Sequence, residues 1–166
     1  MLADAAQRNR AVRGGFGVTV QHPILWNMGS EMLITWGPER TRRVSPLEQW
    51  RAAGADLAAG TDLVRPFNPM INVWGMVTRG TKSAGIQGPE HAISVGTALE
   101  LYTMGTARLN REQDRLGSIT PGKLADLVGY PADPLAADPG DLAELTPAFT
   151  MVGGRPTYDP DKRLAR

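Results

Sequence analysis

Asp62 is the residue of this chain that is best placed to do chemistry. It ends the run Gly60-Thr61-Asp62, directly after the small apolar residues of a segment predicted to be a buried strand. A carboxylate just past such a strand can act as a general base or bind a metal ion. The same residue can also cap the turn that follows the strand. The residues around Asp62 leave both interpretations open.

The chain contains two histidines, His22 and His91, and no cysteine. The lack of cysteine excludes disulfides, thiolate chemistry and cysteine-based zinc sites. Neither histidine has a second ligand residue at a spacing typical of metal sites. We expect His22 to be a strand-end histidine with a satisfied hydrogen bond, or alternatively a substrate contact. We expect His91 to lie on the surface, just before a helix.

The composition favours a globular protein of one ordinary domain, because 166 residues with 42% hydrophobic content suffice for a core. Eighteen basic and seventeen acidic residues give a net charge of +1, so no nucleic-acid partner and no membrane partner is expected. No apolar run approaches the ~20 residues of a membrane span. The N-terminus lacks the basic and apolar stretches of a signal peptide, which predicts a cytoplasmic location.

Predicted helices and strands alternate over the first two thirds of the chain. Helices are expected over residues 3–13, 45–54, 68–78 and 94–104, and strands over residues 16–21 and 55–61. Ser45-Pro46, Asn68-Pro69 and Ser94 supply the helix starts. The alternation predicts a parallel sheet with crossover helices. Two strands alone cannot bury both faces of such a sheet.

Two further segments complete the prediction. Residues 24–44, which contain Trp26 and Trp36, are expected to form a long loop. From residue 116 the pattern changes to short strands and turns. The run Leu116–Val128 predicts a strand, a tight turn and a second strand, with Pro121 and Gly122 at the central positions of a type II turn.

This last run, with Asp133-Pro134-Leu135 after it, resembles a segment near the C-terminus of metal-dependent amidohydrolases. Thr150–Arg155 resembles the closing strand of the same family. Ala52–Asp62 resembles the family segment whose aspartate ends the eighth strand of a barrel. The Trp-bearing segment 25–44, followed by Ser45-Pro46-Leu47, is similar to the amidohydrolase 3 type.

The resemblance implies an α/β fold made of two parts. Residues 1–112 would be the last strands and helices of a (β/α)₈ barrel, a TIM barrel, in which active sites lie at the carboxyl ends of the strands. Residues 113–166 would be the β strands of a small composite sandwich beside that barrel.

The resemblance also implies an activity, which is hydrolysis of a C–N bond, amide or formamide-like, in a small-molecule substrate. Zinc would be the metal of the complete enzyme. Asp62 would be both catalytic and metal-binding, taking a proton from the attacking water and passing it to the leaving group. Trp26, Trp36, Arg40 and His22 are the candidate substrate contacts.

The chain departs from the family pattern in one decisive respect, because the histidines that bind metal in the family have no counterpart in it. The chain alone is therefore expected to bind no metal and to be inactive. Three hypotheses remain. The chain is the C-terminal portion of a larger amidohydrolase, or it is one subunit of a split enzyme whose partner chain supplies the histidines. Alternatively, it is a non-catalytic binding or structural relic retained for homo-oligomer formation.

Overall fold

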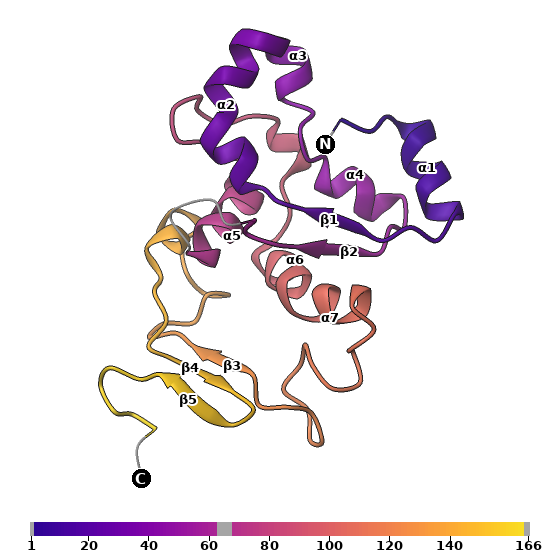
Figure 1. Ribbon diagram of the computed structural model, residues 1–166. Helices are drawn as coiled ribbons and strands as arrows, with labels where there is room; N and C mark the ends of the chain where they lie inside the picture. The colour runs from indigo at the N-terminus through magenta and orange to yellow at the C-terminus, as the bar shows by residue number, and fades with distance from the viewer. Residues whose placement is uncertain (1, 63–67, 165–166) are drawn as a thin grey trace.

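The computed structural model describes residues 2–62 and 68–164 and has a mixed α/β fold (Figure 1). Its helices are α1 (Ala5–Arg13), α2 (Pro23–Trp36), α3 (Pro38–Thr41), α4 (Leu47–Ala52), α5 (Pro69–Thr78), α6 (Val95–Glu100), α7 (Thr106–Leu109), the 3₁₀ helices η1 (Pro89–His91) and η3 (Pro139–Glu144), and the π-helix η2 (Leu101–Gly105). Its strands are β1 (Val18–Val20), β2 (Leu57–Ala59), β3 (Leu127–Gly129), β4 (Phe149–Val152) and β5 (Arg155–Tyr158).

Strands β1 and β2 form a parallel pair, as the alternation of the sequence predicts. Val18 lies opposite Leu57 and Val20 opposite Ala59, and helices α2, α3 and α4 make the crossover between the two strands. The backbone N–H of Gly60 donates to the carbonyl of Val20 across 3.1 Å, which continues the pairing past β2. The residues that follow the two strands therefore lie at the same edge of the pair.

The main core lies between this strand pair and the helices that follow it. Met70, Val73 and Met76 recur every third residue of α5 and are almost fully buried. This spacing directs one face of α5 into the core, where it packs beside β-strand residues such as Leu57 and beside Leu142 of η3. Burying a side chain of this size contributes about 1.5–3 kcal/mol, so these contacts hold α5 in the core, chiefly against η3 and α6.

Two predicted helix starts are confirmed. The side chain of Asn68 accepts a hydrogen bond from the N–H of Met70 at 2.9 Å, and α5 runs on to Thr78. The hydroxyl of Ser94 accepts from the N–H of Thr97 at 3.1 Å and begins α6. In both cases a short polar side chain supplies the acceptor that the free N–H groups of a first turn need.

The predicted loop over residues 24–44 is wrong, because these residues form α2 and α3. Pro23 occupies the first turn of α2, where its missing N–H has no cost. Gly29 lies in the middle of α2, where its lack of a side chain permits close packing. A Cβ at this position would lie 3.1 Å from the Cβ of Ala84. The helix ends only at Gly37, whose φ of 75° favours glycine.

The predicted helix start at Ser45 is also wrong, since α4 begins two residues later at Leu47. Ser45 has a φ of 50°, and its side chain makes no capping hydrogen bond. Its carbonyl instead accepts a hydrogen bond from Arg79. A long-range contact therefore overrides the local capping preference.

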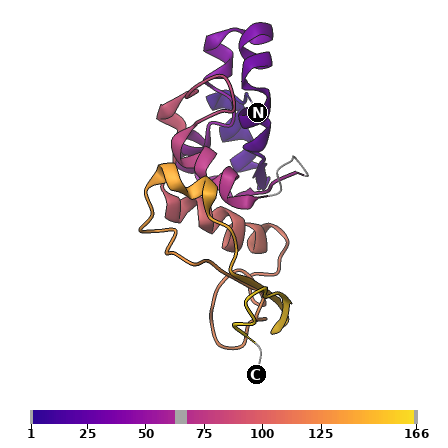
Figure 2. The ribbon, with the colours of Figure 1, turned by 90° about the vertical axis from the view of Figure 1, so that its left-hand side faces the viewer.

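The C-terminal strands form an antiparallel sheet in the order β3-β4-β5, apart from the helices (Figure 2). The predicted turn is present, since the N–H of Lys123 donates to the carbonyl of Thr120 at 3.1 Å and Gly122 has a φ of 92°. The predicted hairpin is wrong, because β3 pairs with β4 rather than with residues 116–119. The division at residues 112 and 113 stays a prediction.

Across the described ranges, the helices are too short or too polar to traverse a lipid bilayer.

Candidate active site at the end of strand β2

Asp62 lies three residues beyond the end of β2 and is exposed. Its φ of 52° places it in the left-handed region, which aspartate tolerates better than most residues. The backbone therefore leaves the line of the strand at Asp62. Pro66, four residues further on, is similar to a proline of the family sequence and lies outside the described residues.

Neutral hydrogen bonds connect the residues just before Asp62 to two helices. The side-chain amide of Asn72 in α5 donates to the carbonyl of Gly60 at 3.1 Å and also to the hydroxyl of Tyr102 in η2. The same Tyr102 hydroxyl lies 3.1 Å from Oγ1 of Thr61. We call Thr61, Asn72 and Tyr102 the strand-end network.

The position of Tyr102 follows from the close packing of η2 on β2. A Cβ on Gly105 would lie 2.4 Å from the backbone carbonyl of Leu57, so only glycine permits this approach. The hydroxyl of Thr106 donates to the carbonyl of Leu101 at 3.0 Å, inside the helical turn. π-Helical turns like η2 often occur at functional sites. Tyr102 lies in this turn.

Burial raises the pKa of Tyr102, and its hydrogen bonds with Thr61 and Asn72 only partly offset this. The phenol is therefore neutral at physiological pH and keeps its proton. Tyr102 also lines a hollow of about 390 Å³ between α7 and residues 116–128. Asp62 does not line that hollow.

His22 follows β1 at the same edge of the pair, but its side chain is fully buried. The imidazole packs against α5, where a Cβ on Gly75 would come within 2.5 Å of its ring. Neither ring nitrogen has a hydrogen-bond partner within the described ranges, so the expected satisfied hydrogen bond is wrong. Burial, and then the charge of Arg79, lower the pKa of His22 well below its ordinary value. A substrate contact of His22 stays a prediction.

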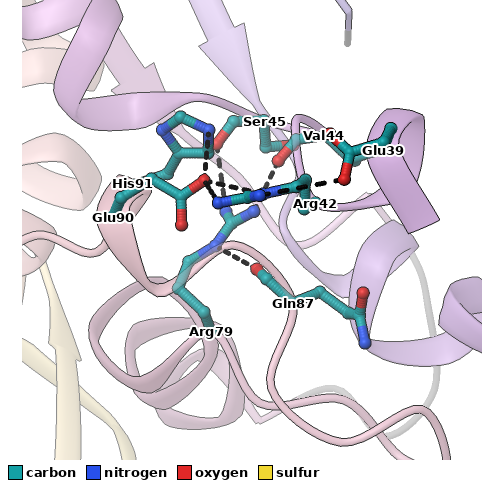
Figure 3. A network of polar contacts seen from close by, with 8 residues as sticks. All are labelled: Glu39, Arg42, Val44, Ser45, Arg79, Gln87, Glu90 and His91. Carbon is teal, nitrogen blue, oxygen red and sulfur yellow. Dashed lines mark hydrogen bonds and ion pairs between the residues drawn. The ribbon is translucent and has the colours of Figure 1, made fainter.

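Arg79 ends α5 in the left-handed conformation and is fully buried (Figure 3). Its guanidinium donates to three backbone carbonyls, those of Val44 (2.6 Å), Ser45 (3.0 Å) and Gln87 (3.0 Å). Burial lowers its pKa to about 10, so it remains charged at neutral pH. We call Arg79 and these carbonyls the buried arginine network. It connects α5 to the segments before α4 and before η1.

His91 is 2% exposed, so the prediction of a surface position is wrong. It lies beside the buried arginine network, and its Nε2 is 3.7 Å from Oε1 of Glu90 (Figure 3). Burial and the charge of Arg79 lower the pKa of His91, and Glu90 partly offsets them. Glu90 in turn accepts from Arg42 at 2.8 Å. His91 belongs to η1, which packs against α4.

The other candidate substrate contacts, Trp26, Trp36 and Arg40, lie at different places along α2 and α3. Trp26 lies in the first turns of α2, close in sequence to the edge that carries Asp62. Trp36 lies ten residues further on, which is about 15 Å along a helix, and packs against the small core of Leu25, Met32 and Val44. Arg40 lies in α3 and is exposed. Their contact with a substrate stays a prediction.

A metal site is not formed by the residues that the structure describes. Within residues 2–62 and 68–164, no group of three or more histidine, cysteine or acidic residues could surround an ion. The side chains of His22 and His91 are buried, and Asp62 can provide one carboxylate. The donor set that zinc needs is therefore incomplete.

Sequence reasoning missed Asn72, Tyr102 and Arg79 as residues that organise the site. Asn72 carried a usable signal, because it is a polar residue in the apolar run Met70–Val77. A buried amide needs hydrogen-bond partners, so such a residue marks a specific contact. Nothing in the local sequence indicated that its partners are Gly60 and Tyr102.

The chain is similar to several known hydrolases. An N-substituted formamide deformylase from Arthrobacter pascens is 26% identical over 161 residues, which are 95% of this chain and 30% of that protein. A 5-methylthioadenosine/S-adenosylhomocysteine deaminase from Desulforudis audaxviator (strain MP104C) is 32% identical over 112 residues, 68% of this chain and 24% of that protein. An uncharacterized metal-dependent hydrolase from Pyrococcus horikoshii OT3 has a similar structure, with a TM-score of 0.65 and 26% identity over 84% of this chain and 29% of that one.

The fold is thus similar to part of that metal-dependent hydrolase, and the sequence profile of the amidohydrolase family matches residues 1–158. The chain belongs to the amidohydrolase family. It spans about 30% of the length of the formamide deformylase.

Proposed function

We propose that the protein takes part in metal-dependent hydrolysis of a C–N bond, in an amide or formamide-like small molecule, and that Asp62 moves the proton. The observation that carries this proposal is the position of Asp62, exposed and three residues past the end of a parallel strand. Family membership supplies the reaction class, and the similarity to a formamide deformylase suggests the substrate class.

The proposed proton transfers are simple. The carboxylate of Asp62 takes a proton from the attacking water while the water oxygen bonds to the substrate carbon. The carboxyl group of Asp62 then delivers that proton to the leaving-group nitrogen as the C–N bond breaks. One carboxylate can serve both transfers if it lies within hydrogen-bond reach of both reacting atoms. The exposure of Asp62 leaves room for a substrate beside it.

A zinc ion needs more ligands than Asp62. When bound, zinc would polarise the substrate carbonyl and the attacking water. Asp62 is the one residue among those described that we assign to it, and we propose that the other ligands come from another part of the same protein or from a partner chain. A cytoplasmic location stays a prediction.

The test is hydrolysis of N-substituted formamides by the protein as its source produces it, with formate release as the readout. Asp62→Asn keeps the size of the side chain and removes the base, so kcat should fall by about 10²-fold or more. Asp56→Asn is the matched control. Asp56 precedes β2 at the opposite end, 3.3 Å from Nε of Arg108, and its substitution should leave kcat unchanged. Equal activities of the two variants would refute the role of Asp62.

A further inference from the structure

The strand-end network has a defined direction of hydrogen donation. The carbonyl of Gly60 can only accept, so the atom of Asn72 that faces it at 3.1 Å is the Nδ2 amide nitrogen. That nitrogen carries a second proton, which it donates to the hydroxyl oxygen of Tyr102. Asn72 is 1% exposed, and the packing of α5 fixes its orientation. Tyr102 therefore receives a hydrogen bond and must place its own proton elsewhere.

Oγ1 of Thr61 is the acceptor for that proton. It lies 3.1 Å from the Tyr102 hydroxyl. The other polar atom bonded to that hydroxyl is Nδ2 of Asn72, which can only donate. A half-buried phenol proton without an acceptor would cost free energy, so donation to Thr61 is favoured. A hydroxyl that accepts one hydrogen bond still has its own proton to donate. The Thr61 proton is thus left for an acceptor from outside this network, immediately before Asp62 in the chain.

We propose that Thr61 donates its hydroxyl proton to an oxygen of the substrate beside Asp62, and that Asn72 and Tyr102 are positioning residues that set the direction of this donation. The proposal rests on the proposed function, because it places the substrate at Asp62. It assigns to the site a neutral hydrogen-bond donor in addition to the carboxylate.

The test compares Thr61→Val with Thr61→Ser in the assay on N-substituted formamides. Valine has the shape of threonine without the hydroxyl, and serine restores the hydroxyl. We expect Thr61→Val to lower kcat about tenfold with little change in KM, and Thr61→Ser to stay within about twofold of the original protein. Tyr102→Phe, which removes the fixed direction but leaves the Thr61 hydroxyl, should give an intermediate loss of about threefold.

A second readout does not depend on activity. Thr61→Val should shift the NMR signals of the Asn72 side-chain amide, although Asn72 contacts Tyr102 rather than Thr61. Thr61→Ser should leave these signals near their original positions. Equal spectra for the valine and serine variants would overturn the direction of donation.

The two proposals fail in different ways. If Asp62→Asn abolishes activity while the valine and serine variants have equal kcat, the role of Thr61 is refuted and that of Asp62 stands. If Asp62→Asn leaves the activity unchanged, the proposed function fails. In that case a shift of the Asn72 signals in Thr61→Val alone supports the donation direction without a substrate at Asp62.

Discussion

Helix α5 takes part in two polar networks that differ in charge and in what they connect. The strand-end network is neutral and connects β2 to α5 and η2 through Thr61, Asn72 and Tyr102. The buried arginine network carries a positive charge and bonds only to backbone carbonyls, with no carboxylate among them. The strand-end network lies next to the exposed carboxylate of Asp62. The buried arginine network lies at the C-terminal end of α5, where it contacts the segments that contain Val44, Ser45 and Gln87 (Figure 3).

This contrast separates two roles for buried polar groups. A buried guanidinium that serves three carbonyls satisfies loop backbone that would otherwise lack partners, and its main effect is on stability. Neutral groups that connect a strand end to helices cost less to bury and fix the orientation of nearby residues. We therefore expect substitutions in the buried arginine network to lower stability and substitutions in the strand-end network to lower activity.

The largest stability effect should come from Arg79→Met, which keeps a long side chain and removes the donors. Three carbonyls then lose their buried partner, and we expect the free energy of unfolding to fall by about 3–5 kcal/mol. Urea denaturation measures this change. Arg79→Lys is the control, since lysine keeps the positive charge but lacks the several N–H donors of the guanidinium. Its free energy of unfolding should fall less than that of Arg79→Met. A loss below about 1 kcal/mol for Arg79→Met would show that the two networks do not differ as described.

A smaller loss is expected at the contact that places η2 against β2. Gly105→Ala puts a Cβ 2.4 Å from the carbonyl of Leu57, which belongs to a strand and cannot move away cheaply. We expect a destabilisation of about 1–3 kcal/mol by thermal unfolding. Gly96→Ala is the matched control, because its nearest neighbour is a Leu135 side-chain atom at 3.7 Å. A helical alanine there should be neutral or stabilising by about 0.5 kcal/mol. Equal effects of the two substitutions would contradict close packing at η2.

Stability should also depend on pH through the two buried histidines. Burial and Arg79 lower the pKa of His22 and of His91 in the folded state, while both return to about 6.5 on unfolding. Below pH 6.5 the unfolded state binds more protons, so the free energy of unfolding falls on acidification, by at most about 1.4 kcal/mol per pH unit for each histidine. Above pH 6.5 this contribution is constant.

Urea titrations between pH 5 and pH 8 measure this slope. His22→Leu removes one titrating group and should reduce the slope between pH 5 and pH 6.5. A slope that is flat over that interval in the original protein would show that the histidines are not buried in the neutral form.

The sequence predicted those features that depend on neighbouring residues. The starts of α5 and α6 follow from Asn68 and Ser94, because a cap acts within one helical turn. The turn at Pro121-Gly122 is equally local. The helix over 23–36 was missed because Gly29 and the polar residues around it resemble a loop, whereas its packing against Ala84 depends on a residue far along the chain.

The site was predicted in part for the same reason. Asp62 was found because it directly follows an apolar strand, and its role stays a prediction. Asn72 and Tyr102 are ten and forty residues away from it, and only the tertiary fold brings them to Gly60 and Thr61. The burial of His91 likewise depends on α4 and Arg79, which its own segment does not indicate.

The most direct test of the central claim is to measure kcat and the free energy of unfolding together for Asp62→Asn and Arg79→Met. The account predicts that Asp62→Asn lowers kcat by about 10²-fold or more with unchanged stability, because its exposed carboxylate does chemistry rather than support the fold. For Arg79→Met it predicts the reverse, a free energy of unfolding lowered by about 3–5 kcal/mol. Full activity in Asp62→Asn, or a loss of stability as large as that of Arg79→Met, would contradict it.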